Sequence, residues 1–322
     1  MPTLTYLQAI REAQLEEMRR DPKVFILGED VQSNMFGTTS GFLEEFGADR
    51  VRDTPIAEAG FVGAAAGAAM VGMRPIVDIT CASFAYPAMD QIISIIAKST
   101  YLYGGQARLP LVLRLGMYYT NSTAAQHSDR PYPMYMNQPG LKIVAPSTPR
   151  DAKGLFKTAI RDDDPVMVFE DTTLWSSRGE VPPDEYFIPL GKADIKRVGN
   201  DVTVAAIAGG VHQSLLAAEA LQAEGLSAEV IDVRSLVPLD RETILESVRK
   251  TGRLVTVDIA NQTCSAGSEI AAIVAEEGFW DLRTPIVRVN TPDTHIPFSP
   301  PLERPLYPNK QRILAAARRA LA

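Results

Sequence analysis

One carboxylate in this sequence is placed where it could take part in chemistry. Glu58 follows Asp53, Thr54 and Pro55, and Asp53 or Thr54 would cap a helix whose first residue is Pro55. Small residues recur behind Glu58 at helical spacing, although each glycine costs roughly 1 kcal/mol in a helix interior: Gly60, Gly63, Ala64, Gly67 and Ala68. We therefore expect another backbone or a flat ligand to pack on this face. Glu58 either complements the positive helix end or acts as an acid beside that ligand.

His127 is a second candidate, because imidazole is the side chain whose ordinary pKa lies nearest to neutral pH. It is the only histidine in the first half of the chain and lies in a long predicted loop, 116–139. Taken alone, a histidine in a loop is more often solvated than functional. We expect an interface or structural role for His212, at the start of a helix, and a structural role for His295, in a proline-rich stretch.

Short apolar strands alternate with helices throughout the chain, and these elements must position both candidates. In the first half we expect a capped amphipathic helix at 3–12, a short helix near Leu43, the helix that begins at Pro55 and continues to Met70, a helix at 88–101 and one that begins at Pro149. The strands expected there are 24–27, 75–79, 111–115, 141–146 and 166–170. In the second half we expect strands at 202–208, 229–235, 254–259 and 286–290, and helices at 211–224, 240–250, 267–277 and 310–321.

This alternation predicts an α/β protein with two domains, each a mostly parallel sheet flanked by helices. A chain of 322 residues is long enough for two cores. We place the first domain at residues 1–176, a linker with little periodicity at 177–192, and the second domain at residues 193–322.

Ligands of open α/β sheets bind beyond the carboxyl ends of the strands. In the first domain the loops at that edge should bring together seven polar or aromatic residues: Glu29, Asp30, Glu58, Phe84, Tyr86, Tyr118 and His127. The sequence has no Walker loop, no GxGxxG fingerprint after a strand and no GxSxG nucleophile elbow. If this domain binds a phosphorylated cofactor, another chain must hold the phosphates.

Composition and charge exclude several classes of protein. The net charge of −7, without a clustered Lys/Arg stripe, gives no sign of nucleic-acid binding. Cys81 and Cys264 lack metal-ligand spacing, and we expect both to be buried. The N-terminus lacks the basic start and apolar run of a signal peptide, and the longest apolar run, 61–73, is too short to span a bilayer. We predict a cytoplasmic protein with no membrane partner.

Several stretches, taken in order, resemble one family. They are DTPIAEAGFVGAAAGAAMVGMRPIVDI, PAMDQI, AAQHS, PGLKIVAPSTPRDAKGL and AIRDDDPV in the first half, and DVTVAAIAGGVHQSLLAAEAL, AEVIDVRSLVPLD and SVRKTGRLVTVD in the second. Together they are similar to the beta chain of thiamine-diphosphate-dependent 2-oxo acid dehydrogenases, the decarboxylating components of the pyruvate, branched-chain 2-oxo acid and acetoin complexes. The resemblance covers nearly the whole chain. It implies a pyrimidine-binding fold followed by a transketolase C-terminal-type fold.

The resemblance also implies roles for individual residues. Glu58 stands where the family has the acid that hydrogen-bonds the cofactor's aminopyrimidine and so promotes loss of the thiazolium proton. Phe84 would pack on the pyrimidine and Ile56 would wall its pocket. His127 would lie near the reacting carbon, where it can position the substrate or help the acyl group leave to lipoamide.

The same resemblance implies partners and ions. The chain has no Gly-Asp-Gly…Asn motif, so an alpha subunit should hold Mg²⁺ and the diphosphate in an α2β2 heterotetramer. An acyltransferase core would carry the lipoyl groups. Some relatives bind potassium at a segment that corresponds here to Ala159, Ile160, Asp162 and Asp164, and oxygen ligands would suit that ion. A solvated acidic turn before Pro165 explains these residues equally well.

Two loops depart from the family's usual sequence: 116–123, which is usually rich in glycine, and 129–140, which usually ends in a second histidine before Pro-Gly. Both would flank the substrate, so the 2-oxo acid and the acyl acceptor stay open. One alternative is a two-subunit transferase that passes an acyl or ketol unit to an aldehyde or sugar without lipoamide. Others are a non-catalytic assembly subunit and a nucleotide-binding α/β protein, the latter weakened by the missing phosphate loops.

Overall fold

The computed structural model describes all residues from 1 to 322 and divides the chain into two compact units. The first unit comprises Met1–Tyr118 and Met134–Leu190, and the second comprises Tyr119–Pro133 and Gly191–Ala322. The segment 119–133, which carries His127, therefore clusters with the C-terminal half of the chain, although the sequence inserts it into the N-terminal half.

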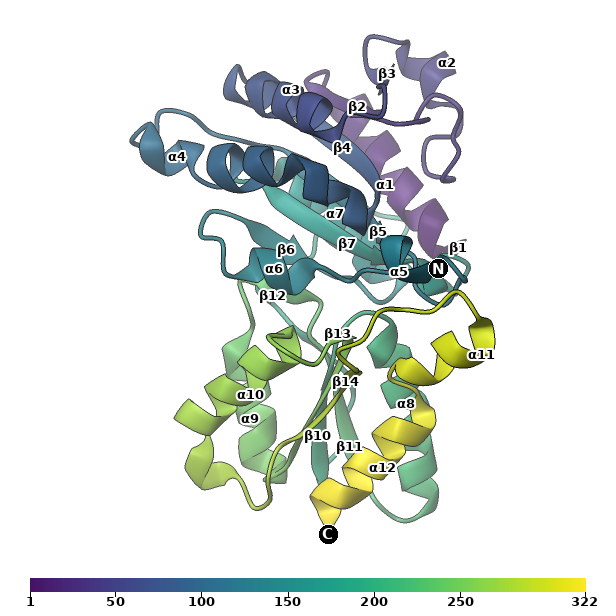
Figure 1. Cartoon of the computed structure of the whole chain (residues 1–322), viewed down its shortest axis with the longest axis vertical. Helices are drawn as coiled ribbons and strands as arrows, with labels where there is room; N and C mark the ends of the chain where they lie inside the picture. Colours follow the sequence, from purple (N-terminus) through teal and green to yellow (C-terminus); the bar gives the residue numbers. More distant parts are fainter. The chain divides into compact units, whose positions relative to one another are not determined.

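The sheet of the first unit has six parallel strands in the order β6–β7–β5–β4–β2–β3 (Figure 1). The strands are β2 (Val24–Gly28), β3 (Val51–Asp53), β4 (Arg74–Cys81), β5 (Val112–Met117), β6 (Lys142–Val144) and β7 (Val166–Asp171). Strands β2, β5 and β7 are buried along their whole length, which explains their nearly continuous apolar runs. The predicted parallel α/β fold is confirmed.

Helices cover this sheet: α1 (Tyr6–Arg20), α2 (Phe42–Phe46), α3 (Glu58–Met70) and α7 (Pro149–Arg161). The Thr5 side chain caps α1 in a capping box with Gln8, as the sequence predicts. Helix α1 packs against α7, and acidic side chains of α1 pair with basic ones of α7: Glu12 with Lys153 at 2.9 Å and Glu17 with Arg161 at 2.8 Å.

The helix predicted at 88–101 is not one regular helix. The chain forms a 3-10 segment, η1 (Ala82–Ala88), then a π-helical turn, η2 (Gln91–Ile96), and the short helix α4 (Ser99–Leu102). The Ser99 hydroxyl donates to the Ile95 carbonyl at 2.7 Å, and Gly140 passes so close that a Cβ there would lie 1.9 Å from the Ala97 carbonyl oxygen. The Ser99 hydrogen bond and the close approach of Gly140 accompany this irregular conformation, which stands in place of a regular helix.

The stretch predicted as a linker contains a strand. Strand β8 (Arg178–Glu180) pairs with β1 (Thr3–Thr5) in an antiparallel ladder, so the start of the chain is held by residues that follow β7. A single 3-10 turn, η3 (Thr172–Leu174), connects β7 to this region.

The second unit has its own sheet, in the order β14–β13–β10–β11–β9. Its strands are β9 (Asp194–Arg197), β10 (Val202–Ala206), β11 (Ala228–Asp232), β13 (Leu254–Asn261) and β14 (Val287–Thr291), and β12 (Ser235–Val237) follows β11. All pairs are parallel except that of β9, an edge strand that the sequence did not reveal.

The helices of the second unit are α5 (Ala124–His127), α8 (Gly209–Ala223), α9 (Arg241–Thr251), α10 (Ala266–Glu277), α11 (Pro300–Glu303) and α12 (Lys310–Leu321), and α6 (Tyr132–Met136) follows α5. Cys81 is buried but Cys264 is exposed, so the expectation of burial was wrong for Cys264. No helix in the chain combines the length and the apolarity that crossing a bilayer requires.

Candidate active site

Glu58 is the first residue of α3, and its side chain is buried at the positive end of that helix. The predicted helix start at Pro55, with Asp53 or Thr54 as the cap, was wrong. The chain stays extended through Thr54, whose N–H donates to the Gly28 carbonyl at 3.0 Å, and Asp53 accepts the backbone N–H of Gln32 at 2.8 Å. Pairing with β2 therefore delays the helix and leaves Glu58 as the acidic residue of its first turn.

A second carboxylate lies close enough to Glu58 to feel its charge. Glu29 directly follows β2. Burial and, after it, the charge of Glu58 raise the pKa of Glu29 above its usual value, with smaller contributions from Asp30 and Asp78. The start of α3 and the end of β2 therefore form an acidic region in which Glu29 holds a proton more readily than a solvated carboxyl group would.

Phe84 and Ile56 occupy different surroundings. Phe84 is half-buried in η1, which follows β4 and packs against α3. Ile56 precedes α3 and is 83% exposed, so nothing in the first unit covers this apolar side chain. The first unit thus supplies one half-buried aromatic residue near α3 and one exposed apolar residue.

An ion cluster that sequence reasoning missed lies inside the sheet. Arg114 on β5 donates to both oxygens of Glu170 on β7 at 2.7 and 2.8 Å, and to Asp78 on β4 at 2.7 Å. Burial lowers the pKa of Arg114, but the attraction of Asp78 and Glu170 outweighs it, so the pKa lies above its ordinary value. Trp175 also donates to Glu170 at 3.1 Å. The signal was a charged residue within or at the end of each of three largely apolar strands.

Three of the five small residues that the sequence singled out on α3 are exposed. The buried face of this helix consists of five other residues: Phe61, Val62, Ala65, Ala66 and Ala69. Gly60, Ala64 and Gly67 are exposed, and a Cβ at Gly67 would meet nothing within 4 Å. Within the chain, the predicted packing is seen among these glycines only at Gly63, where a Cβ would lie 3.5 Å from the Gln91 side chain.

His127 ends the short helix α5 and belongs to the second unit, whereas Glu58, Ile56 and Phe84 belong to the first. Of the other residues predicted at the strand ends, Tyr118 packs edge-on against Trp175 with ring centroids 5.3 Å apart, and Tyr86 is partly exposed. Within the first unit, the structure brings together Glu58 and Glu29.

Segment 119–133 is fastened to the second unit at both ends. Near its start, Glu303 on α11 accepts the backbone N–H of Thr120 at 2.7 Å and of Ser122 at 3.2 Å. Glu303 is fully buried, and no pattern in the surrounding proline-rich sequence marks it.

The other end of the segment is held by buried polar groups on β13. Arg130 donates to the Ile259 carbonyl at 3.0 Å and to the Asn261 side chain at 3.0 Å. The Tyr132 hydroxyl donates to Asp258, which also accepts the backbone N–H groups of Ala260 and Gly267. Burial raises the pKa of Asp258 despite these hydrogen bonds.

Two family models match this chain. The model of the transketolase pyrimidine-binding domain matches residues 2–176, and that of the transketolase C-terminal domain matches residues 191–313. The chain is 46% identical over 321 residues to the beta subunit of an acetoin:2,6-dichlorophenolindophenol oxidoreductase of Bacillus subtilis, covering 95% of this chain and 94% of that one. The chain belongs to the transketolase-like beta-subunit family of 2-oxo acid dehydrogenases.

Other members of this beta-subunit family match along their full length. The 2-oxoisovalerate dehydrogenase subunit beta of Bacillus subtilis is 45% identical, with 99% of this chain and 98% of the relative covered. The pyruvate dehydrogenase E1 component subunit beta of the same organism is 41% identical, with 100% and 99% covered. A solved structure described as a split gene transketolase, inactive beta4 tetramer, matches with a TM-score of 0.82 at 25% identity, covering 99% of this chain and 98% of that chain.

Basic side chains contact the segment that the sequence resemblance suggested as a potassium site. Arg74 donates to the carbonyl oxygens of Ile160 at 3.0 Å and of Asp162 at 2.9 Å. Lys142 pairs with the carboxylates of Asp162 at 2.8 Å and of Asp164 at 3.1 Å. The Ala159 carbonyl accepts the backbone N–H of Asp162 at 3.3 Å. The oxygen atoms predicted as ligands therefore already take part in hydrogen bonds or ion pairs within the chain.

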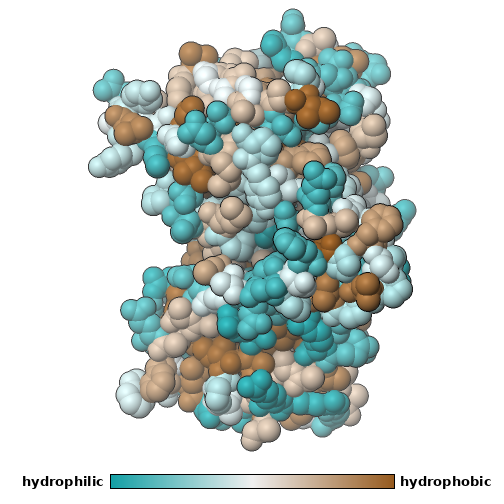
Figure 2. All heavy atoms as spheres, viewed as in Figure 1, coloured by the Kyte–Doolittle hydropathy of each residue, from teal (hydrophilic) through white to brown (hydrophobic).

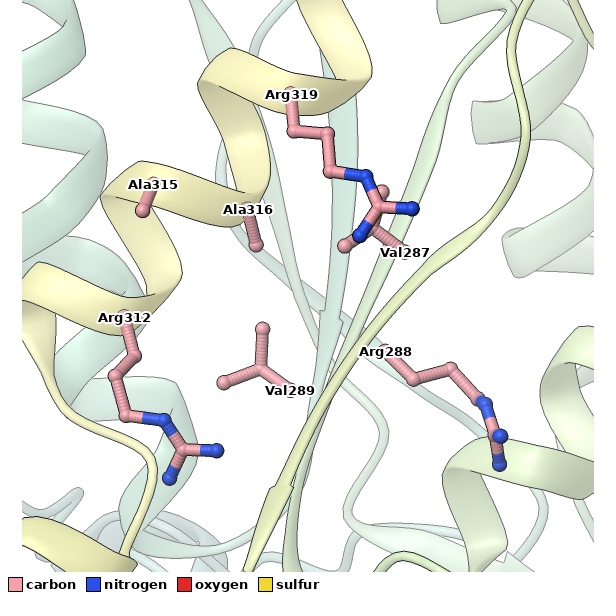
Figure 3. A pocket seen from close by; sticks show the side chains of 7 residues that line it. All are labelled: Val287, Arg288, Val289, Arg312, Ala315, Ala316 and Arg319. Atoms are coloured by element: carbon pink, nitrogen blue, oxygen red, sulfur yellow. The ribbon is translucent and has the colours of Figure 1, made fainter.

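A shallow groove of about 310 Å³ lies between β14 and α12 in the second unit and contains none of the predicted site residues. Its floor consists of valine and alanine side chains, and Figure 2 shows hydrophobic atoms gathered over this face. Arg312 and Arg319 project from α12 over it, whereas Arg288 points away from α12 (Figure 3). Arg312 is engaged by the carbonyls of Leu306 and Asn290, so it is not free to bind an anion.

Proposed function

We propose that this chain is the beta subunit of an α2β2 component that oxidatively decarboxylates a 2-oxo acid with thiamine diphosphate and passes the acyl group to lipoyl groups of an acyltransferase core. The observation that carries the proposal is the buried Glu58 carboxylate at the start of α3, in a chain 41% to 46% identical to beta subunits of such dehydrogenases. The cytoplasmic location predicted from the sequence belongs to this proposal.

The residues of the first unit suit the cofactor. Thiamine diphosphate, when bound, supplies a nucleophilic carbon once its thiazolium proton has been removed. Glu58 would hold a proton between its carboxyl group and the far ring nitrogen of the aminopyrimidine, and its buried place at the start of α3 supports this role. Phe84 would pack on the pyrimidine ring, and Ile56 would close its edge.

His127 would act on the substrate side. An imidazole can donate a hydrogen bond to a carboxylate or carbonyl of the 2-oxo acid, and it can supply a proton at the acyl-transfer step. The half-buried position of His127 at the end of α5 leaves its ring within reach of a small molecule.

An alpha subunit would complete the site. The sequence has no motif for Mg²⁺ and the diphosphate, so both would be held by the partner. The exposed Ile56 and the open Gly60, Ala64 and Gly67 on α3 support a partner surface beside Glu58. A potassium ion does not enter the proposal for this chain, because Arg74 and Lys142 engage its predicted ligands.

A second function, transfer of an acyl or ketol unit, has some support. The fold match to a split gene transketolase, together with the altered loops 116–123 and 129–140, supports an acyl or ketol transfer to a carbon acceptor. This alternative keeps the cofactor and the role of Glu58 and changes only the acceptor.

One experiment separates the two functions. The chain is co-purified with its alpha subunit and supplied with thiamine diphosphate and Mg²⁺. Straight-chain and branched 2-oxo acids and acetoin are offered with an artificial electron acceptor, and acceptor reduction and carbon dioxide release are measured. Acceptor-dependent turnover of one compound supports the dehydrogenase and identifies its substrate class. If the cofactor binds but no compound reduces the acceptor, and an aldehyde acceptor yields a carbon–carbon product instead, the transferase is the correct function.

A further inference from the structure

The segment that carries His127 has an unusual backbone. Three of its residues that are not glycine have positive φ angles: Thr120 at 68°, Ser122 at 56° and Ala124 at 57°. Residues with a Cβ disfavour this left-handed region, so three of them within five positions need support from their surroundings.

Glu303, near the C-terminus, supports this stretch of backbone. It is separated from Thr120 by 183 positions, and its Oε1 and Oε2 atoms accept the N–H groups of Thr120 and Ser122. The Tyr307 hydroxyl donates to Oε1 at 3.0 Å, and its ring packs on that of Tyr119 with centroids 4.7 Å apart. A fully buried carboxylate thus binds two backbone amides of the strained stretch.

We propose that Glu303 is a positioning residue that fixes segment 119–133 and, through it, the orientation of His127 for the reaction. This inference rests on the proposed function, because it assigns the orientation of the substrate-side residue to the C-terminal half of the chain. The clustering of 119–133 with the second unit, and the Arg130 contacts at its other end, agree with that assignment.

A carboxylate suits this task better than its neutral analogue. Glu303 presents two acceptor oxygens to two N–H donors, and hydrogen bonds to a charged acceptor are stronger than neutral ones. In Glu303→Gln one oxygen becomes an NH₂ group that faces an N–H donor, so one of the two amides loses its partner. Glu303→Asp keeps both oxygens on a shorter side chain.

The test compares these two variants with the matched control Glu276→Gln, which makes the same chemical change on the exposed side of α10. All proteins are studied in the reconstituted alpha–beta pair. Amide hydrogen exchange is followed in peptides that cover 119–128 and, as an internal reference, 254–261 in β13. The values of kcat and KM for the 2-oxo acid and the Kd of thiamine diphosphate are measured in parallel.

We expect Glu303→Gln to speed exchange at 119–128 by about tenfold or more, since a charge-assisted hydrogen bond contributes roughly that factor. The reference peptide should be unchanged. We expect kcat/KM for the 2-oxo acid to fall by about tenfold, and the Kd of thiamine diphosphate to stay constant, because the residues proposed to bind its pyrimidine lie in the first unit. Glu303→Asp should recover part of both losses, and Glu276→Gln should match the wild type.

Unchanged exchange at 119–128 in Glu303→Gln would overturn the proposal. Faster exchange with unchanged kcat/KM would also overturn it, because Glu303 would then hold the segment without serving the reaction. If Glu303→Gln does not fold, Tyr307→Phe removes one donor to the same carboxylate and keeps the ring, and it should raise exchange at 119–128 by a smaller factor. If the wild-type pair turns over no substrate, the proposed function fails, while the exchange data still decide whether Glu303 holds the segment.

Discussion

The start of α3 and segment 119–133 each carry a candidate for the chemistry, but the chain holds them in different ways. Glu58 stands on a helix whose apolar face packs on a parallel sheet, and residues close to it in sequence build its surroundings. His127 stands on a segment with irregular backbone that is held by hydrogen bonds to two distant parts of the chain, the buried Glu303 side chain and the Ile259 carbonyl. A regular helix therefore holds Glu58 in place, whereas hydrogen bonds hold the segment that carries His127.

The difference predicts where each region tolerates change. A helix on a sheet keeps its place when one polar side chain is altered, because dispersed apolar contacts hold it. A loop held by a few buried hydrogen bonds depends on each of them, because an unpaired buried group is costly. Substitutions near Glu58 should therefore change chemistry without changing the fold, whereas substitutions around segment 119–133 should change both.

Replacement of Glu58 should have the largest effect on activity. Glu58→Gln keeps the side-chain size and removes the acid, so turnover of the reconstituted pair should fall by about 10³-fold, within the range of general acid–base catalysis. Thermal unfolding should hardly move. A variant that keeps full activity would show that the chain acts as an assembly subunit, and Glu29→Gln, measured beside it, reports the contribution of the neighbouring carboxylate.

Removal of Arg114 should have the largest effect on stability. Arg114→Met leaves Asp78 and Glu170 as uncompensated buried charges, which costs about 3–5 kcal/mol in the free energy of unfolding. Urea denaturation measures the loss. The control is Arg19→Met, because Arg19 makes an equally short pair with Glu45 on the surface and should have little effect. Equal losses for both variants would show that the buried position of Arg114 is not what matters.

Part of the fold and of the candidate site can be predicted from the sequence alone. The central strands of both sheets, the long helices of the second unit and the candidacy of Glu58 follow from local pattern and from the family resemblance. The cap of α3 was mispredicted because the pairing of β3 with β2, which extends the chain through Thr54, is not a local property. The ion cluster could have been found, since Asp78, Arg114 and Glu170 each interrupt an apolar strand.

Glu303 marks the limit of sequence reasoning. It lies in a proline-rich stretch without periodicity, and its partners are backbone amides, which no side-chain pattern reveals. The same holds for the positive φ angles of Thr120, Ser122 and Ala124, because none of these residues is glycine. The segment that departs most from the family's usual sequence is therefore also the one whose backbone geometry could not be predicted from its residues.

Replacement of His127 should have a smaller effect than that of Glu58. His127→Asn keeps a hydrogen-bond donor and removes proton exchange, so kcat/KM for the 2-oxo acid should fall by about 10²-fold. The Kd of thiamine diphosphate, measured by calorimetry, should not change. His295→Asn, at an exposed position in the second unit, is the control and should behave as the wild type. A kcat/KM that survives in His127→Asn would remove this residue from the site.

The smallest effect concerns the end of α7, where basic side chains contact the oxygen atoms predicted as ion ligands. Arg74 donates to the last carbonyls of the helix, which also places a positive charge at its negative end. Arg74→Met should lower the free energy of unfolding by about 1 kcal/mol, since these hydrogen bonds are partly exposed. A second measurement concerns potassium itself. The wild type should unfold at the same urea concentration in KCl and in NaCl of equal ionic strength, because oxygen atoms predicted as ligands already bond to Arg74 and Lys142. A stabilisation specific to potassium in the wild type would contradict this and restore the potassium site.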